Sequence, residues 1–170
     1  CINDVKAVDR FFQELCAAQE NLHWRPRYLL LPGSETEKQS LADEGLLFQS
    51  PTRQNIIDAF QHFEQAMDGD FCLLYYSGHG STVAAPVVWQ GYEAGDILQT
   101  IVCADSRIDG KPDLLDKELG YLIAKAMDGK VPDLAGQKSG VHFLAIFDSC
   151  HSGTVTRGEE NTRMVARMAE

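Results

Sequence analysis

Apolar residues recur at intervals of three and four near the start of the chain. The repeating positions are Ile2, Val5, Val8, Phe11, Phe12 and Leu15. This spacing places apolar side chains on one side of a helix. We expect Asn3 or Asp4 to cap that helix, because short polar side chains can accept a hydrogen bond from the free amides of its first turn.

Two further segments show helical spacing. Residues 50–67 begin with the helix-start signal Pro51-Thr52, and the apolar residues that share one face are Ile56, Phe60, Phe63 and Met67. Residues 113–127 form the third predicted helix, with Asp113 as its expected cap.

Short continuous apolar runs alternate with these helices. They cover residues 27–33, 71–80, 97–105 and 141–150, and such runs are typical of buried strands in parallel sheets. The polar segments 34–45 and 128–140 are predicted to be loops. Helices that alternate with buried strands indicate an α/β domain layered around a mostly parallel sheet, and 170 residues suit a single domain.

The charge of the chain narrows the choice of partners. Fifteen Lys and Arg against 25 Asp and Glu give a net charge of −10, which argues against a nucleic-acid partner, because phosphate backbones attract clustered Lys and Arg. No apolar run approaches the roughly 20 residues of a membrane span. An acidic protein of this kind is better suited to a basic ligand.

Cysteine usage points to a reducing compartment. There are five cysteines and no Cys-x-x-Cys pair, which does not fit a disulfide framework or a structural zinc site. We therefore expect a cytoplasmic protein without a metal or cofactor. Three of the cysteines, Cys16, Cys72 and Cys103, are interpreted as inert buried thiols.

Two of the predicted strands end in residues that can do chemistry. The segment YYSGHG (75–80) delivers His79, and FDSCHSG (147–153) delivers Cys150. Ligands bind beyond the carboxyl ends of parallel strands, so neighbouring strands would bring these residues together as a nucleophilic thiol and its base. Gly78 and Gly80 would let the backbone turn tightly and bring an amide near a reacting carbonyl oxygen.

Simpler interpretations exist for both residues. Cys150 could be one more buried thiol, and His79 a turn residue between glycines. His151 is also a candidate base, but adjacent residues on a strand point to opposite faces, which places it poorly for Cys150. The other histidines, His23, His62 and His142, are interpreted as structural or exposed.

Taken together, the two segments resemble the paired signature of the caspase-like cysteine peptidases, specifically the metacaspases and their bacterial relatives. The supporting segments are CINDV (1–5), PTRQNI (51–56), and VCADSR (102–107) with DLLDKEL (113–119). The resemblance implies a three-layer α/β/α fold that is incomplete at both ends of this chain. Residues 1–170 would be the large-subunit portion of the peptidase domain, with 151–170 as a mobile loop after the catalytic segment.

The resemblance also implies roles for individual residues. His79 would be the general base and acid, Cys150 the nucleophile, and the backbone amides of Gly80 and Cys150 the oxyanion hole. Metacaspases cleave after Arg or Lys, and the positions that match their acidic pocket are Asp4, Asp148, Ser77 and Cys1. A pair of carboxylates would select a guanidinium by charge and geometry. Cleavage after Asp, as in true caspases, is not expected.

Calcium and self-processing follow from the same resemblance. Many metacaspases need calcium, held by aspartates that include an Asp-Asp pair, but the matching residues here are Asp116 and Lys117. We therefore predict no metal site, and we interpret the nearby acidic residues Asp96, Asp105, Asp113 and Asp116 as caps and loop residues. The predicted sites of self-cleavage in a zymogen are Arg157, Arg163 and Arg167.

The sequence thus predicts a cysteine endopeptidase that attacks peptide or protein substrates after Arg or Lys, using a Cys-His dyad and an acyl-enzyme. A catalytically inactive caspase-like scaffold that binds partners is the main alternative. An enzyme with Cys1 as an N-terminal nucleophile is a second. A redox-sensing thiol at Cys150 is a third, and it could coexist with peptidase activity.

Overall fold

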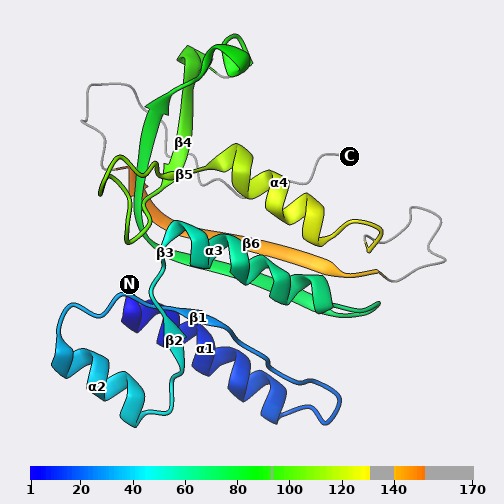
Figure 1. Cartoon of the computed structure of the whole chain (residues 1–170). Helices are drawn as coiled ribbons and strands as arrows, with labels where there is room; N and C mark the ends of the chain where they lie inside the picture. The colour runs from blue at the N-terminus through cyan, green and yellow to red at the C-terminus, as the bar shows by residue number, and fades with distance from the viewer. Residues whose placement is uncertain (93, 131–139, 152–170) are drawn as a thin grey trace.

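The computed structural model describes residues 1–92, 94–130 and 140–151 (Figure 1). The α-helices are α1 (Ile2–Ala17), α2 (Glu35–Asp43), α3 (Arg53–Ala59) and α4 (Asp116–Ala126), and the 3₁₀ helices are η1 (Phe60–Gln65), η2 (Val87–Trp89) and η3 (Ala94–Asp96). The strands are β1 (Tyr28–Leu29), β2 (Phe48–Gln49), β3 (Phe71–Ala84), β4 (Ile97–Ile101), β5 (Leu114–Leu115) and β6 (His142–His151). No helix in the described part of the chain is long and apolar enough to cross a membrane.

The described residues form two sheets. The larger has the order β5-β4-β3-β6, and β1 and β2 form a separate parallel pair. The longest pairing joins β3 and β6 in parallel over ten residue pairs, while β4 runs antiparallel to β3 over five pairs and to β5 over two. Most paired residues are therefore in parallel ladders, as predicted, but β4 and β5 make the sheet mixed.

The core lies between this sheet and three helices on one of its faces. Residues from α3, η1 and α4 pack on alternate residues of the central strands, and the buried members of this core include Ile56, Phe60, Leu114 and Ala126. The strand residues on this face are Cys72, Leu74, Tyr76, Phe143 and Phe147. We call this surface the helix-covered face.

The opposite face of the sheet carries α1. Phe12 of α1 stacks on Phe71 of β3, with ring centroids 6.3 Å apart, and on Trp24 at 4.8 Å. Asp9 of α1 is buried and accepts hydrogen bonds from Trp24 Nε1 (2.6 Å) and Tyr28 Oη (2.7 Å). Figure 1 shows α1 and α4 on opposite sides of the β3–β6 pair, so the three-layer α/β/α arrangement is confirmed.

One segment predicted to be a loop is helical. Residues 34–45 contain α2, which begins after Ser34, whose hydroxyl accepts a hydrogen bond from the Glu37 amide at 3.1 Å. Of its residues only Leu41 is buried, so the segment lacks the apolar spacing by which the other helices were predicted. A serine followed three residues later by glutamate is a helix-start signal that indicates this helix without any apolar pattern.

Helix ends also differ from expectation. The first helix begins at Ile2, so Asn3 and Asp4 lie inside its first turn and neither caps it. Helix α4 begins only at Asp116, because Leu114 and Leu115 pair as β5 with β4, and Asp113 instead bonds Thr100 and Arg107.

The predicted helix over 50–67 is shorter and changes type. It is α3 followed by η1, which ends at Gln65. Met67, predicted on its apolar face, lies beyond it and is 67% exposed. In the predicted loop 128–140, residues 131–139 lie outside the described part of the chain.

Candidate functional site

The register of β3 and β6 brings the two sequence motifs together. His79 is the Cα partner of Cys150, and Ser77 is the Cα partner of Asp148. Directly opposed residues share a face, and residues two apart along a strand share it as well. All four positions therefore belong to one face, opposite the helix-covered face; we call it the site face.

At Gly80, β3 changes its partner. Gly80 pairs with both His151 of β6 and Ile101 of β4, and from there to Ala84 the strand pairs with β4 alone. The prediction that the first motif ends its strand is therefore wrong: the strand continues as one arm of a hairpin. Only its parallel ladder ends there, and it ends at the same point as β6, which is why the two motifs still meet at one edge.

His79 is exposed at this edge. Its backbone is held from the neighbouring loop, since the Val102 amide donates to the His79 carbonyl oxygen at 2.9 Å. The side chains of Cys150 and His151 lie outside the described part of the structure. The pairing of the two motifs therefore rests on the backbone register.

The predicted substrate-binding residues lie together beside the paired motifs. Ser77 and Asp148 come two residues before His79 and Cys150 on their strands. Ser77 Oγ donates a hydrogen bond to Asp4 Oδ2 at 3.2 Å, which joins the first turn of α1 to β3. Asp148, opposite Ser77, is exposed. Cys1 precedes α1, and its backbone nitrogen lies 2.8 Å from the same Asp4 oxygen.

Tyr75 belongs to this group, although the sequence did not single it out. Burial raises the pKa of its phenol, and the charges of Asp148 and Asp4 raise it further. Both carboxylates therefore lie near enough to Tyr75 to raise the pKa of its phenol; we call Asp4, Tyr75, Ser77 and Asp148 the acidic cluster. The sequence could have indicated Tyr75 by its position. It precedes Ser77 and His79 at intervals of two along one strand, so its side chain belongs to the same face.

The other acidic candidates make contacts within the chain. Asp105 accepts from the Arg53 amide at 2.7 Å, Asp96 from the Gly91 amide at 2.6 Å, and Asp116 from the Lys117 amide at 2.8 Å. Asp113 accepts from Arg107 at 2.9 Å. Among residues 1–92, 94–130 and 140–151, no group of three or more His, Cys, Asp or Glu is arranged to hold a metal ion.

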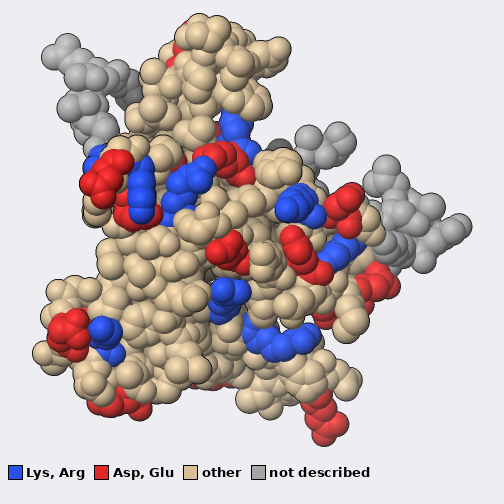
Figure 2. Space-filling view, viewed as in Figure 1, with Lys and Arg blue, Asp and Glu red and all other residues tan. Residues whose placement is uncertain are grey.

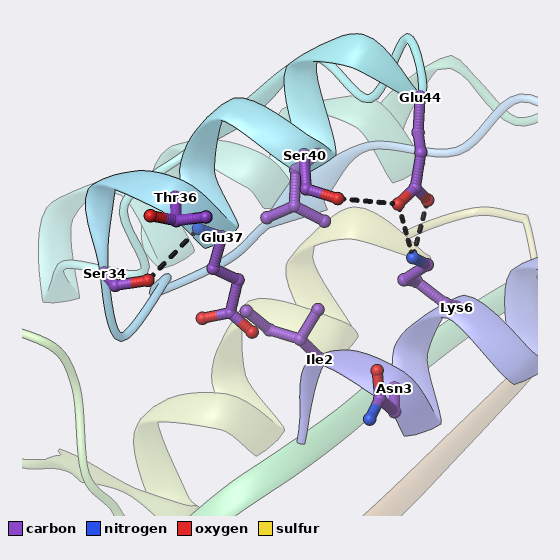
Figure 3. A pocket seen from close by; sticks show the side chains of 9 residues that line it. Ile2, Asn3, Lys6, Ser34, Thr36, Glu37, Ser40 and Glu44 are labelled. Atoms are coloured by element: carbon purple, nitrogen blue, oxygen red, sulfur yellow. Dashed lines mark hydrogen bonds and ion pairs between the residues drawn. The ribbon is translucent and has the colours of Figure 1, made fainter.

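A separate pocket of about 330 Å³ lies between α1 and α2 (Figure 3). Its lining includes Lys6 and Glu44, which are paired at 2.8 Å, and Ser40, which also bonds Glu44. None of the predicted site residues lines it. On the side of the molecule drawn in Figure 2, acidic and basic side chains are interspersed and do not gather into a basic patch.

The arginines predicted as self-cleavage sites, Arg157, Arg163 and Arg167, lie outside the described residues. The proposed oxyanion donors are placed by their backbone only: Gly80 is buried, and both Gly80 and Cys150 belong to the β3–β6 ladder.

Comparison with known proteins identifies relatives of this chain. The sequence model of the family described as "Metacaspase, peptidase C14 domain" matches residues 1–157. The chain is 30% identical over 155 residues to Metacaspase-1 of Mycosarcoma maydis, covering 91% of this chain and 31% of that protein. It is 28% identical over 155 residues to Metacaspase-1B of Aspergillus terreus, covering 91% and 33% respectively.

The chain thus spans about a third of the length of these curated relatives. Among solved structures, it is similar to a crystal structure of a Geobacter sulfurreducens protein, with 30% identity and a TM-score of 0.40, over 71% of this chain and 40% of that one.

Proposed function

Because this chain belongs to the metacaspase family of C14 peptidases, we propose that it provides the catalytic residues of a cysteine endopeptidase that cleaves after Arg or Lys. The observation that carries the proposal is the register of β3 and β6, in which His79 and Cys150 are directly opposed at the end of the parallel ladder. Opposed positions on neighbouring strands can bring a thiol nucleophile and its proton acceptor together.

In the proposed reaction, the Cys150 sulfur attacks the carbonyl carbon of the scissile peptide and forms a carbon–sulfur bond. His79 takes the thiol proton and passes it to the leaving amine as the carbon–nitrogen bond breaks. Water then attacks the thioester, releases the acid product and restores the thiol. The amides of Gly80 and Cys150 are proposed to stabilise the oxyanion of each tetrahedral intermediate.

The proposed preference for Arg or Lys is supported by the acidic cluster. The charges of Asp148 and Asp4 both raise the pKa of Tyr75, and Ser77 donates a hydrogen bond to Asp4. The two carboxylates therefore lie on the site face beside Ser77, two residues before His79 on β3. Two carboxylates can accept several hydrogen bonds from one guanidinium. An aspartate side chain at the same place would meet like charge.

The decisive experiment uses the full-length protein and fluorogenic peptides that end in Arg, Lys or Asp. We expect cleavage after Arg and Lys, none after Asp, and complete loss of cleavage in Cys150→Ala. His79→Ala should lower kcat by about 10²–10⁴, the usual contribution of a general base. Activity that survives Cys150→Ala, or cleavage after Asp alone, would overturn the proposal.

We also propose that the protein is made as a zymogen, cleaves itself after Arg157, Arg163 or Arg167, works in the cytoplasm and needs no metal. The same incubations test self-cleavage. The wild-type protein should shorten with time after one of these arginines, and the Cys150→Ala variant should stay intact.

A further inference from the structure

The hydroxyl of Tyr76 reaches the backbone of the residue proposed as the base. Tyr76 lies on the helix-covered face, with its ring against that of Phe147 at a centroid distance of 6.2 Å. Its hydroxyl donates to the His79 carbonyl oxygen at 2.8 Å and lies 3.3 Å from the Val102 carbonyl oxygen. A phenol has one proton to donate, and the shorter distance assigns it to His79.

The same carbonyl oxygen also accepts the Val102 amide at 2.9 Å. A carbonyl oxygen has two lone pairs, so both of those on His79 are used, one by a side chain and one by the backbone. The peptide unit between His79 and Gly80 is therefore held from two sides at the point where β3 exchanges β6 for β4.

Gly78 makes room for this contact. A Cβ atom at position 78 would lie 2.7 Å from the Tyr76 hydroxyl oxygen and 2.9 Å from the ring carbon that carries it. Distances under 3.0 Å force one group to move, so any side chain at this position would push the phenol away from His79. The first glycine of YYSGHG is thus explained by the tyrosine two residues before it.

We infer that Tyr76 is a positioning residue, which fixes the His79–Gly80 peptide through its hydroxyl and depends on the missing side chain of Gly78. This inference rests on the proposed function. The peptide is planar and trans, so holding the His79 carbonyl also sets the direction of the Gly80 amide. One hydroxyl therefore orients the backbone of both the proposed base and a proposed oxyanion donor.

The test replaces Tyr76 with Phe in the full-length protein, which keeps the ring and removes the hydroxyl. We expect kcat for Arg-terminated peptides to fall about tenfold, because small displacements of a catalytic group are costly. KM should stay within about twofold, because Asp4, Ser77 and Asp148 keep their places. Tyr121→Phe, which removes an exposed hydroxyl on α4, should change neither constant.

A second readout does not depend on activity. His79-Gly80 is the single His-Gly step in these 170 residues, so labelling His with ¹³C at the carbonyl and Gly with ¹⁵N selects this peptide by NMR. The signal is assigned by its disappearance in His79→Gln. Tyr76→Phe should shift it, and Tyr121→Phe should not.

Gly78→Ala provides an independent test of the contact between Tyr76 and His79. It should shift the signal, and it should cost less kcat in the Tyr76→Phe background than in the wild type, because the contact is already lost. An unmoved signal or an unchanged kcat in Tyr76→Phe would overturn the inference. If the wild type cleaves no Arg or Lys peptide, the proposed function fails, and the NMR shift alone then decides whether Tyr76 holds the peptide.

Discussion

Alternate residues of β3 and β6 build two faces with different physical properties. On the helix-covered face, Cys72 is 7% exposed and its neighbours pack against the core formed by α3, η1 and α4. On the site face, Phe71 is 51% exposed, Leu144 38% and Ile146 41%. The two sets of residues have the same backbone, the same ladder and nearly the same apolar composition.

The difference shows how one strand pair can serve both stability and chemistry. Burying apolar area stabilises a fold by about 25 cal/mol per Å², and the helix-covered face supplies that burial. Under the proposed function the site face must remain accessible, because a peptide substrate would have to reach His79 and the acidic cluster. Tyr76 connects the two faces: its ring packs in the first, and its hydroxyl bonds the backbone of a residue whose side chain belongs to the second.

The largest expected effect tests whether burial really differs between the faces. Leu74→Ala, on the helix-covered face, should destabilise the protein by about 2–3 kcal/mol, the usual cost of emptying part of a packed core. Leu144→Ala is the matched change on the site face, and it should cost less than about 1 kcal/mol because the side chain is already partly in water. The measurement is the shift of the urea unfolding midpoint.

Equal costs for the two leucines would contradict the comparison. They would mean that the site face is as well packed as the core. Peptidase activity gives a second contrast, since neither leucine is placed in the site, and kcat should be unchanged in whatever fraction of each variant is folded.

The second effect tests whether the site face recognises a basic side chain, as proposed. Asp148→Asn removes one of the two carboxylates whose charges raise the pKa of Tyr75. We expect kcat/KM for Arg-terminated peptides to fall about tenfold, mainly through KM, because a charge-assisted hydrogen bond is worth about 1.5–3 kcal/mol. Asp128→Asn is the matched control, since it removes the same charge from an exposed turn after α4. A similar loss in both variants would assign the effect to net charge rather than to the acidic cluster.

The sequence predicted those parts of the fold that burial dictates. Ile56 and Phe60 are enclosed as their spacing indicated, and the strands over 71–80 and 141–150 form the central pair. Helix α2 was missed because its fold depends on a cap at Ser34 rather than on an apolar stripe. The extension of β3 to Ala84 depends on pairing with β4, and a pattern within one segment does not show which strand will pair with it.

The site was predicted unevenly for a similar reason. His79 and Cys150 were placed together by the order of two motifs, and the strand register agrees. The contact between Ser77 and Asp4 spans 73 positions, and the resemblance suggested it where spacing could not. Tyr75 and Tyr76 were counted only as members of an apolar run, because a strand pattern assigns a tyrosine to a face but does not show what its hydroxyl reaches.

The smallest expected effect concerns stability in the part of β3 that pairs with β4 beyond Gly80. There Arg107 bonds both Ser81 of β3 and Asp113, each at 2.9 Å. Burial raises the pKa of Asp113, but hydrogen bonds from Arg107, Ser106 and Thr100 outweigh it, so the pKa lies below its usual value. A carboxylate with a lowered pKa stabilises the fold above its unfolded pKa of about 4, and this stabilisation is lost as the pH falls through the folded value.

Arg107→Gln removes the strongest of these hydrogen bonds and leaves the burial in place. The melting temperature of the variant should therefore lie below that of the wild type at pH 6–7, by about 2–4 °C for an interaction near 1 kcal/mol. The gap should narrow as the pH falls through the lowered pKa of Asp113 in the wild type, because below that pKa the carboxyl is protonated in both proteins. Lys125→Gln, which removes an exposed charge from the last turn of α4, should show no such trend. A gap for Arg107→Gln that is constant from pH 3 to 7 would mean that Arg107 acts through Ser81 and packing. The ion pair between Arg107 and Asp113 would then not stabilise the sheet beyond Gly80.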